Sequence, residues 1–380
     1  MAEMSTTSTT KNFSLKRVII KGLLLFLSIN LLSVILAPLP ILGQLSAYNH
    51  IFPGRVRLPY GEIPDQAYNL SLYNLEAMFA SHELVAGNKP AGEFRVVLIG
   101  DSSVWGYLLK PKDTLSSYLN ASNLVTKEGK LVRAYNLGYP TLSLTKDLLI
   151  LDYAIHYQPD LIIWLFTLES FPLIKQLDSP IVQNNPSKVR DLITKYDINL
   201  DIHDQRFFSP SFLDSTLVGE RRALADLLRL QIYGIMWAAT GIDQYYPVTY
   251  EPPQSDLALD DTFHDLQPPK LKTEDLSIEI LTAGRKISGD VPILYVNEPI
   301  YISHGENSDI RYNFFYPKWA YDQYRPLIDN ICQMERWHCL DAWNLVPSAE
   351  FTNSAIHMTP FGTKMLADQL GNSILSLSSP

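Results

Sequence analysis

Three short segments contain residue types that serve in acyl-transfer chemistry. The first is Gly100-Asp101-Ser102-Ser103, directly after the apolar run 95–100. A serine at a strand-to-helix turn can expose its hydroxyl as a nucleophile, and its own N–H can face a substrate oxyanion. Taken alone, this segment favours a helix cap, because Asp and Ser side chains accept hydrogen bonds from the first free N–H groups of a helix.

The other two segments supply an N–H donor and a base. Asn136-Leu137-Gly138 ends a second apolar run, and a glycine there lets the backbone approach a ligand closely. His357 precedes the sequence Met-Thr-Pro-Phe-Gly, and an imidazole can take the proton of a serine hydroxyl. Each segment alone has an ordinary alternative, a turn glycine or a solvated loop histidine.

Together the three segments resemble the SGNH (GDSL-type) hydrolase family. The resemblance covers roughly residues 94–170 and 291–375. It implies a flavodoxin-like three-layer α/β/α fold and an acyl-serine intermediate. By position, Ser102 corresponds to the nucleophile and His357 to the base, and the N–H groups of Ser102 and Gly138 to two oxyanion donors.

The third motif of that family departs from its pattern here. The family ends its third strand with Gly-x-Asn-Asp, whose Asn side chain is the third oxyanion donor, whereas this chain has Thr167-Leu168-Glu169-Ser170. An ionised Glu169 cannot donate a hydrogen bond. Three alternatives stay open: Glu169 is protonated, Thr167 or Ser170 donates instead, or the oxyanion hole is weaker.

The acid of the family's triad is also altered. The family places an Asp three residues before its His, where this chain has Ser354, next to Asn353. A neutral side chain stabilises an imidazolium less than a carboxylate does. A Ser-His dyad oriented by a backbone carbonyl is one alternative. The candidate acids or orienting groups are Asp101, Asn353, Ser354 and Glu350, with Asp341 as a more distant possibility.

Short apolar runs alternate with helical spacing along most of the chain. Such alternation predicts a parallel five-stranded sheet covered by helices on both faces. The expected strands are 95–100, 133–138, 160–166, 291–297 and 338–343, and the expected helices are 111–122, 143–157, 317–334 and 360–377. The Asn297-Glu298 pair ends the fourth strand on the side where α/β folds place their sites, so both residues and Glu169 are candidate substrate contacts.

Residues 170–285 interrupt this alternation of strands and helices. We expect them to form an insertion near the carboxyl ends of the strands. They contain one strong helix, 220–241, in which Asp226 and Arg229 argue against a second membrane span. We expect this helix to pack on the sheet domain or to rest at a membrane surface. Whether the insertion is a lid, a membrane contact or a partner site stays open.

The N-terminus has the pattern of a membrane anchor. Residues 18–43 contain an apolar stretch long enough for a spanning helix, and Pro38 and Pro40 mark its outer end. The whole chain has a net charge of −9. Residues 1–21 carry +3, so the remaining residues carry −12. The positive-inside rule puts the tail 1–17 in the cytoplasm and the remainder outside. A cleaved signal peptide is the alternative, although its cleavage pattern is poor.

Composition limits the remaining possibilities. With 46% hydrophobic and 19% charged residues, the chain can bury a substantial core, and its acidic balance argues against a nucleic-acid partner. Cys332 and Cys339, which would lie in an oxidising compartment, either form a disulfide or are two small buried thiols. No nucleotide-binding or metal-ligand motif occurs, so we expect no cofactor and no metal. Oligomeric state cannot be read from the sequence.

These patterns predict a tail (1–17), an anchor (18–43), a juxtamembrane linker and helix (44–93) and one SGNH-like domain (94–380). The first functional hypothesis is a serine-dependent acyl-ester hydrolase or O-acyltransferase that acts outside the membrane on an envelope carbohydrate ester. The resemblance adds that membrane-anchored members of this family act on polysaccharide or wall-polymer esters of bacterial envelopes. The second hypothesis is a degenerate domain that binds a glycan or a partner without turnover.

Overall fold

A five-stranded parallel sheet forms the centre of the molecule. The computed structural model describes residues 14–60 and 72–378, so the predicted tail up to residue 13 and part of the linker lie outside the described residues. The strands are β1 (Glu93–Ile99), β2 (Leu131–Asn136), β3 (Leu161–Phe166), β4 (Ile293–Asn297) and β5 (His338–Asp341). Their order is β2-β1-β3-β4-β5, every neighbouring pair being parallel. This is the flavodoxin-like order, and the predicted fold class is confirmed.

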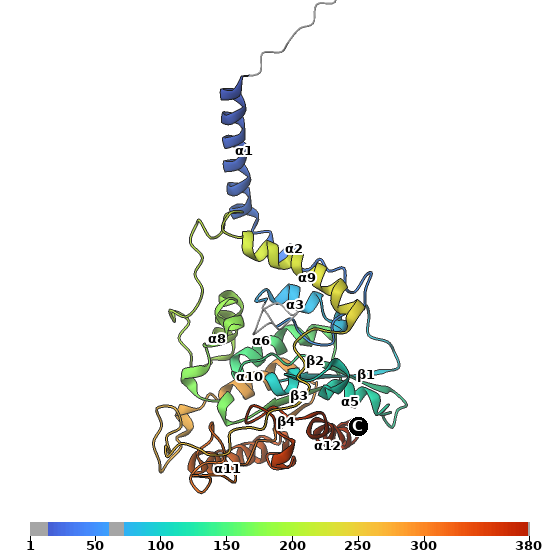
Figure 1. Ribbon diagram of the computed structural model, residues 1–380, viewed down its shortest axis with the longest axis vertical. Helices are drawn as coiled ribbons and strands as arrows, with labels where there is room; N and C mark the ends of the chain where they lie inside the picture. Colours follow the sequence, from blue (N-terminus) through green and yellow to red (C-terminus); the bar gives the residue numbers. More distant parts are fainter. Residues whose placement is uncertain (1–13, 61–71, 379–380) are drawn as a thin grey trace, which may run out of the picture.

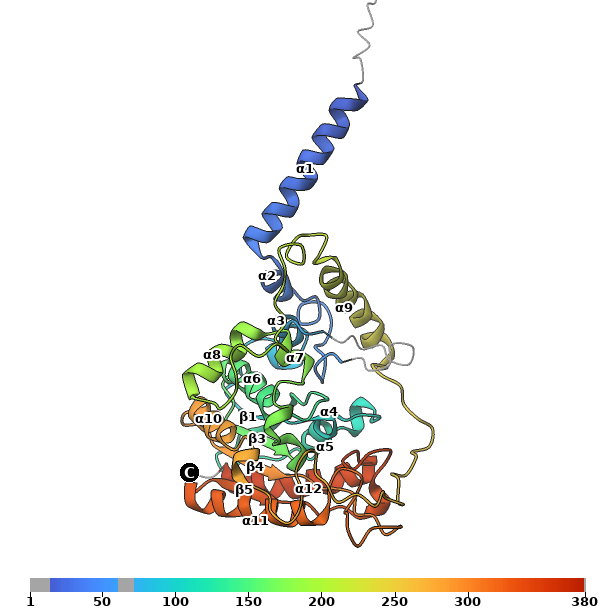
Figure 2. The ribbon, with the colours of Figure 1, turned by 90° about the vertical axis from the view of Figure 1, so that its left-hand side faces the viewer.

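Strands β1, β3 and β4 are buried along their whole length because both faces of the sheet are covered there. Along β3, Ile162 and Trp164 belong to one core and Ile163 and Leu165 to the other, as the alternation of side chains in a strand requires. The first core lies under α6 (Leu144–Ala154), α10 (Glu279–Ser288) and α11 (Lys318–Glu335), and the second under α5 (Leu115–Ala121) and α12 (Pro360–Leu377). The molecule therefore has the three layers α/β/α (Figures 1 and 2).

The N-terminal helix stands apart from these layers. Helix α1 (Leu15–Leu36) is long and apolar enough to cross a membrane by length and composition, and most of its side chains are exposed. Ala37 ends it in a left-handed conformation, and the short helix α2 (Leu39–Gly43) follows, with Pro40 in its first turn. Figure 1 shows α1 projecting away from the rest of the molecule.

The segment after β3 holds α7 (Pro180–Gln183), α8 (Pro186–Tyr196) and the long helix α9 (Arg221–Thr240). Helix α8 packs against α6, whereas α9 lies at the end of the domain that faces α1 (Figure 1). Before the sheet, α3 (Leu75–Ala80) packs on α2. Short 3-10 helices occur at Glu83–Val85, Pro111–Asp113, Ile155–Tyr157, Leu168–Ser170, Leu173–Lys175, Thr273–Asp275 and Ser348–Glu350.

A disulfide joins the last turn of α11 to the edge strand β5, through Cys332 and Cys339. The closed loop spans a separation of seven residues and contains the helix-to-strand turn. The two cysteines are therefore a disulfide and not the pair of buried thiols that was the alternative.

Candidate functional site

Ser102 lies at the carboxyl end of the central strand β1. Gly100 follows the strand and sits so close to β3 that an added Cβ would meet Leu165 O at 2.9 Å and Val104 Cγ2 at 2.6 Å. Asp101 then caps the short helix α4 (Ser102–Trp105), because its Oδ1 accepts a hydrogen bond of 2.8 Å from the Ser103 N–H. Ser102 is the first residue of this helix and half-buried, so the cap and an accessible hydroxyl occur together.

His357 meets Ser102 across a separation of 255 residues. Its Nε2 lies 2.7 Å from Ser102 Oγ. A bridge between Phe351 and Met358 closes the turn that holds the histidine, and Thr359 caps α12 directly after it by accepting a hydrogen bond from the Gly362 N–H. Two helix starts, those of α4 and α12, thus bring the hydroxyl and the imidazole together.

Asn353 lies behind the imidazole, where a triad would have a carboxylate. Its Oδ1 is 3.1 Å from His357 Nδ1. An amide oxygen accepts, so Nδ1 carries the proton and Nε2 presents its lone pair to the Ser102 hydroxyl. Asn353 is exposed on the surface. The arrangement is a Ser-His-Asn constellation in which the third member is neutral.

The pKa of His357 is lowered to about 4 because burial disfavours the charged imidazolium. The ring of Tyr107 covers one side of the imidazole, with ring centroids 4.8 Å apart. Within residues 14–60 and 72–378 no carboxylate contacts His357, and desolvation is the cause of its lowered pKa. The imidazole is consequently neutral at pH 7, which is the state that a general base needs.

The other residues predicted as the acid or orienting group behind His357 form hydrogen bonds with other partners. Glu350 accepts a hydrogen bond from the Thr359 hydroxyl, and Asp341 binds Asn297 and Arg325. Asp101 caps α4, and Ser354 donates its backbone N–H to Thr352 O within the turn. Of the proposed acids and orienting groups, Asn353 is the one that contacts His357.

Two of the three predicted oxyanion donors already have partners. The Gly138 N–H donates to Asn136 Oδ1 at 3.0 Å, and an added Cβ on Gly138 would collide with Trp105 N. The Thr167 hydroxyl is fully buried and bonds Tyr316 Oη. The Ser102 N–H lies in the first turn of α4 and has no acceptor within residues 14–60 and 72–378. Only the Ser102 N–H keeps the predicted role without a change in this structure.

Glu169 is a buried member of an ion-pair cluster. It pairs with Lys175, and its Oε2 lies 2.9 Å from His264 Nε2. The Glu169 carboxyl group therefore lies between Lys175 and His264. No local pattern links Glu169 to His264, which lies 95 residues further along the chain.

Asn297 and Glu298 both have hydrogen-bond partners within the protein. Asn297 donates to Asp341 Oδ1 at 2.8 Å and accepts from the hydroxyls of two buried tyrosines, Tyr321 and Tyr324. Glu298 is fully buried, and its Oε2 accepts a hydrogen bond from the Ser103 hydroxyl. Both side chains are buried and bonded within the protein in this structure, and a substrate contact by either residue stays a prediction.

Glu298 instead forms a buried carboxyl pair with Asp101 beneath the nucleophile. Its pKa is raised well above the usual range by desolvation, and the neighbouring charge of Asp101 raises it further. Asp101 Oδ2 and Glu298 Oε1 have no other hydrogen-bond partner among the described residues. Burial and the neighbouring Asp101 both favour the protonated form of Glu298, in which its proton could bond Asp101. Lys146 lies in the same buried layer, with Nζ 2.7 Å from Gly100 O.

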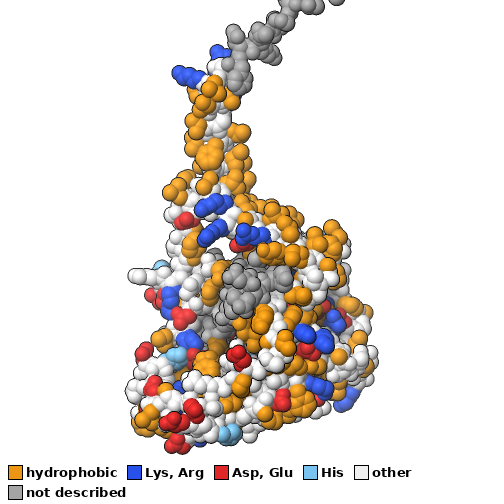
Figure 3. Space-filling model, viewed as in Figure 1, with side chains coloured by type: hydrophobic (Ala, Val, Ile, Leu, Met, Phe, Trp, Pro, Cys, Tyr) orange, Lys and Arg blue, Asp and Glu red, His pale blue; other side chains and the backbone are white. Residues whose placement is uncertain are grey.

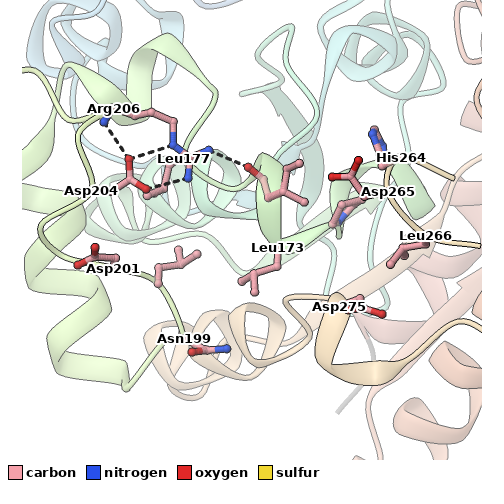
Figure 4. A pocket seen from close by; sticks show the side chains of 13 residues that line it. Leu173, Leu177, Asn199, Asp201, Asp204, Arg206, His264, Asp265, Leu266 and Asp275 are labelled. Atoms are coloured by element: carbon pink, nitrogen blue, oxygen red, sulfur yellow. Dashed lines mark hydrogen bonds and ion pairs between the residues drawn. The ribbon is translucent and has the colours of Figure 1, made fainter.

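A cavity of about 390 Å³ lies within the segment that follows β3, and its lining residues fall between Pro172 and Asp275 (Figure 4). Leu173 and Leu177 give it apolar walls, and His264 lies at one end of it. At the other end Arg206 binds Asp204. Neither Ser102 nor His357 lines this cavity, which is therefore distinct from the Ser-His pair.

No protein-family model and no curated protein matches the sequence. Among solved structures, a carbohydrate acetylesterase family member from Sinorhizobium meliloti is similar at 13% identity, over 75% of this chain and 100% of that chain, with a TM-score of 0.32. An aryl esterase from M. smegmatis is similar at 11% identity, over 74% and 99%, with a TM-score of 0.35. Scores of this size carry no argument, so the fold assignment rests on strand order and the site on its own geometry.

Proposed function

We propose that this protein is a serine-dependent acyl-ester hydrolase or O-acyltransferase. The observation that carries the proposal is the 2.7 Å contact between Ser102 Oγ and a His357 Nε2 that is free to accept a proton. A hydroxyl within hydrogen-bond reach of an oriented neutral imidazole is the arrangement for nucleophilic catalysis.

The reaction follows from these atoms. Ser102 Oγ attacks the acyl carbon and passes its proton to His357 Nε2, and the Ser102 N–H donates to the oxyanion. The imidazolium then protonates the leaving oxygen as the ester C–O bond breaks. Water or an acceptor hydroxyl then attacks the acyl-serine and passes its proton to Nε2. As the bond between the acyl carbon and Ser102 Oγ breaks, the imidazolium returns this proton to Oγ, which restores the serine and releases the acyl product. Asn353 holds the tautomer throughout by accepting from Nδ1–H.

We assign the substrate to carbohydrate esters outside a membrane crossed once by α1. The length and composition of α1 support an anchor, and the basic residues before it favour a cytoplasmic N-terminus. The disulfide supports an oxidising compartment for the domain. The carbohydrate-ester class comes from the resemblance of the Ser102 and His357 segments to the SGNH family, whose membrane-anchored members act on polysaccharide or wall-polymer esters.

A test is the hydrolysis of 4-nitrophenyl acetate by the full chain in detergent, compared with Ser102→Ala. Ser102→Ala is expected to lower kcat by about 10³-fold or more, because a nucleophile acts as a unit with its base. Ser103→Ala is a matched control, since the Ser103 hydroxyl bonds Glu298 and does not contact His357. Equal rates for Ser102→Ala and the unchanged chain would overturn the assignment.

A second candidate is a degenerate domain that binds a glycan or partner without turnover. It is favoured by the neutral Asn353 and by the engaged Gly138 N–H and Thr167 hydroxyl. Labelling with a fluorophosphonate separates the two functions. Stoichiometric labelling that disappears in Ser102→Ala supports the enzyme, and no labelling of folded protein supports the binder.

A further inference from the structure

Helix α9 carries an apolar stripe that no part of the described chain covers. Leu228, Ile232, Ile235 and Met236 are 63%, 50%, 50% and 42% exposed. Their spacing of three and four residues puts them on one face of the helix. An exposed stripe of large aliphatic side chains is an interaction surface in a folded protein.

The opposite face of α9 fixes the direction of this stripe. Leu230, Gly234 and Trp237 are buried against the segment that follows α2. Tyr48 Oη donates to Leu230 O at 2.8 Å, and the Tyr48 ring lies so close to Gly234 that an added Cβ would collide with it. The helix is thus docked on the domain by one side, and the stripe points outward.

The loop that leads into α9 runs along the anchor helix. The Val218 N–H donates to Asn30 Oδ1 at 3.2 Å, and the Ser33 hydroxyl donates to Glu220 Oε2 at 3.2 Å. Asn30 lies six residues before the end of α1, which corresponds to about 9 Å along the helix. If α1 crosses a bilayer, this loop enters the apolar region of the leaflet nearest the domain.

The composition of the loop suits that depth. Phe212 and Leu213 are 63% and 73% exposed, and they line a hollow of about 670 Å³ between the loop and α1. The α1 side of the hollow consists of the apolar Phe26, Leu27 and Leu31 together with Asn30. In a bilayer, these Phe and Leu side chains would contact lipid acyl chains instead of water.

The loop and α9 lie at the end of the domain next to α1. Figure 1 shows α9 running across the molecule below the end of α1. In Figure 3 the hydrophobic surface of α1 continues over this end, with Lys and Arg side chains at the junction. The exposed Arg221, Arg222 and Arg229 of α9 provide cations at that level, as the polar face of an interfacial helix does.

We propose that the loop 208–220 and the apolar stripe of α9 form a membrane-contacting ledge that lies in the surface of the bilayer crossed by α1. The occupant is the lipid surface itself, since the ledge is continuous with an apolar spanning helix and bordered by arginines. The inference deepens the proposed membrane anchoring and rests on it.

The ledge also fixes the height of the Ser102 site above the bilayer. Directly after α9, Asp243 forms a buried ion pair with Arg57, whose Nη1 donates to Gly106 O at 2.8 Å. Gln244 Nε2 donates to the same Gly106 O and to Leu109 O. Gly106 ends the helix that begins with Ser102, so the ledge is joined to the nucleophile turn by buried polar bonds.

Spin labels on the full chain in phosphatidylcholine–phosphatidylglycerol vesicles test the ledge. One cysteine is introduced per variant: Met236→Cys on α9, Leu213→Cys on the loop, Leu24→Cys on α1, and Leu259→Cys as an exposed control outside the ledge. Power saturation compares access of oxygen, which concentrates in lipid, with access of a water-soluble nickel chelate. The ratio of oxygen to nickel access is expected to be several-fold higher at residues 236, 213 and 24 than at residue 259.

Each other outcome overturns a defined statement. If residue 24 is in lipid but residues 236 and 213 match residue 259, the ledge is wrong and the anchor stands. If residue 24 is also in water, the anchor itself is wrong. If residue 236 is shielded from both reagents, a second copy or another protein covers α9, and the lipid surface is not its partner.

Discussion

The two sides of the Ser102–His357 pair are built in opposite ways. Beneath Ser102, the carboxyl groups of Asp101 and Glu298 are buried as neighbours, and burial together with Asp101 raises the pKa of Glu298. Behind His357, where a carboxylate would stabilise the imidazolium, the partner is the exposed amide of Asn353. The acidic side chains Asp101 and Glu298 thus hydrogen-bond the turn that holds Ser102. The neutral Asn353 contacts His357, the residue that becomes positively charged during the reaction.

This difference teaches how burial divides structural from chemical roles. A carboxyl in an apolar layer is stable only when protonated or paired, and in that state it supplies a hydrogen bond rather than a charge. A charge behind His357 would favour the imidazolium and raise the pKa of the histidine. With Asn353 there instead, the base is ready at low pH but gains less stabilisation as it takes the proton.

The largest expected effect is on the buried side. Glu298→Ala removes the acceptor of the Ser103 hydroxyl and leaves Asp101 Oδ2 without its shared proton, so we expect the free energy of unfolding to fall by about 3 kcal/mol. Glu298→Gln, whose amide can donate to Asp101 in place of the acid proton, is expected to stay within about 1 kcal/mol. Urea unfolding of the full chain in detergent measures both.

The pH dependence of that comparison has a defined sign. Because the folded pKa of Glu298 is raised, the stability it contributes is complete below its unfolded pKa of about 4.5 and is lost as pH rises toward the folded value. Glu298→Gln does not titrate, so it should gain stability relative to the unchanged chain as pH rises. A pH-independent difference, or equal losses for Gln and Ala, would mean that Glu298 is ionised in the fold.

The next effect is on the exposed side. Asn353→Asp places a carboxylate 3 Å behind His357 Nδ1, and we expect kcat to rise by about 10- to 100-fold, less than the roughly 10⁴-fold effect of the corresponding Asp in a buried protease triad. The hydrolysis of 4-nitrophenyl acetate measures it. Ser354→Asp adds the same charge one residue away from the group that contacts the imidazole, and it should leave kcat nearly unchanged. Equal gains in both variants would point to a general charge effect.

Sequence reasoning reached the parts of this site that are encoded locally. The strands and the positions of Ser102 and His357 follow from apolar runs and helix-start residues, each readable within about ten neighbours. The flavodoxin-like arrangement of the strands was implied by the family resemblance. The choice of Asn353 over Glu350 depends on which way two side chains of one turn point, and no pattern encodes that. The Glu169–His264 pair and the Glu298–Ser103 bond join residues 95 and 195 positions apart, so they appear only once the sheet has brought its strand ends together.

The smallest expected effect is a shift of the acidic limb in the pH profile of kcat/KM. Since the pKa of His357 is lowered to about 4, kcat/KM of the unchanged chain should be level from pH 8 down to about pH 5 and fall below it, where the imidazole becomes protonated and can no longer accept the Ser102 proton. In Asn353→Asp the new carboxylate favours the imidazolium, so the same fall should begin at higher pH. Hydrolysis rates at low substrate concentration across this range give both curves, with Ser354→Asp expected to follow the unchanged chain. A fall centred near pH 6.5 in the unchanged chain would mean that His357 is solvated. The comparison of a buried acid pair with a desolvated neutral base would then be wrong for the base.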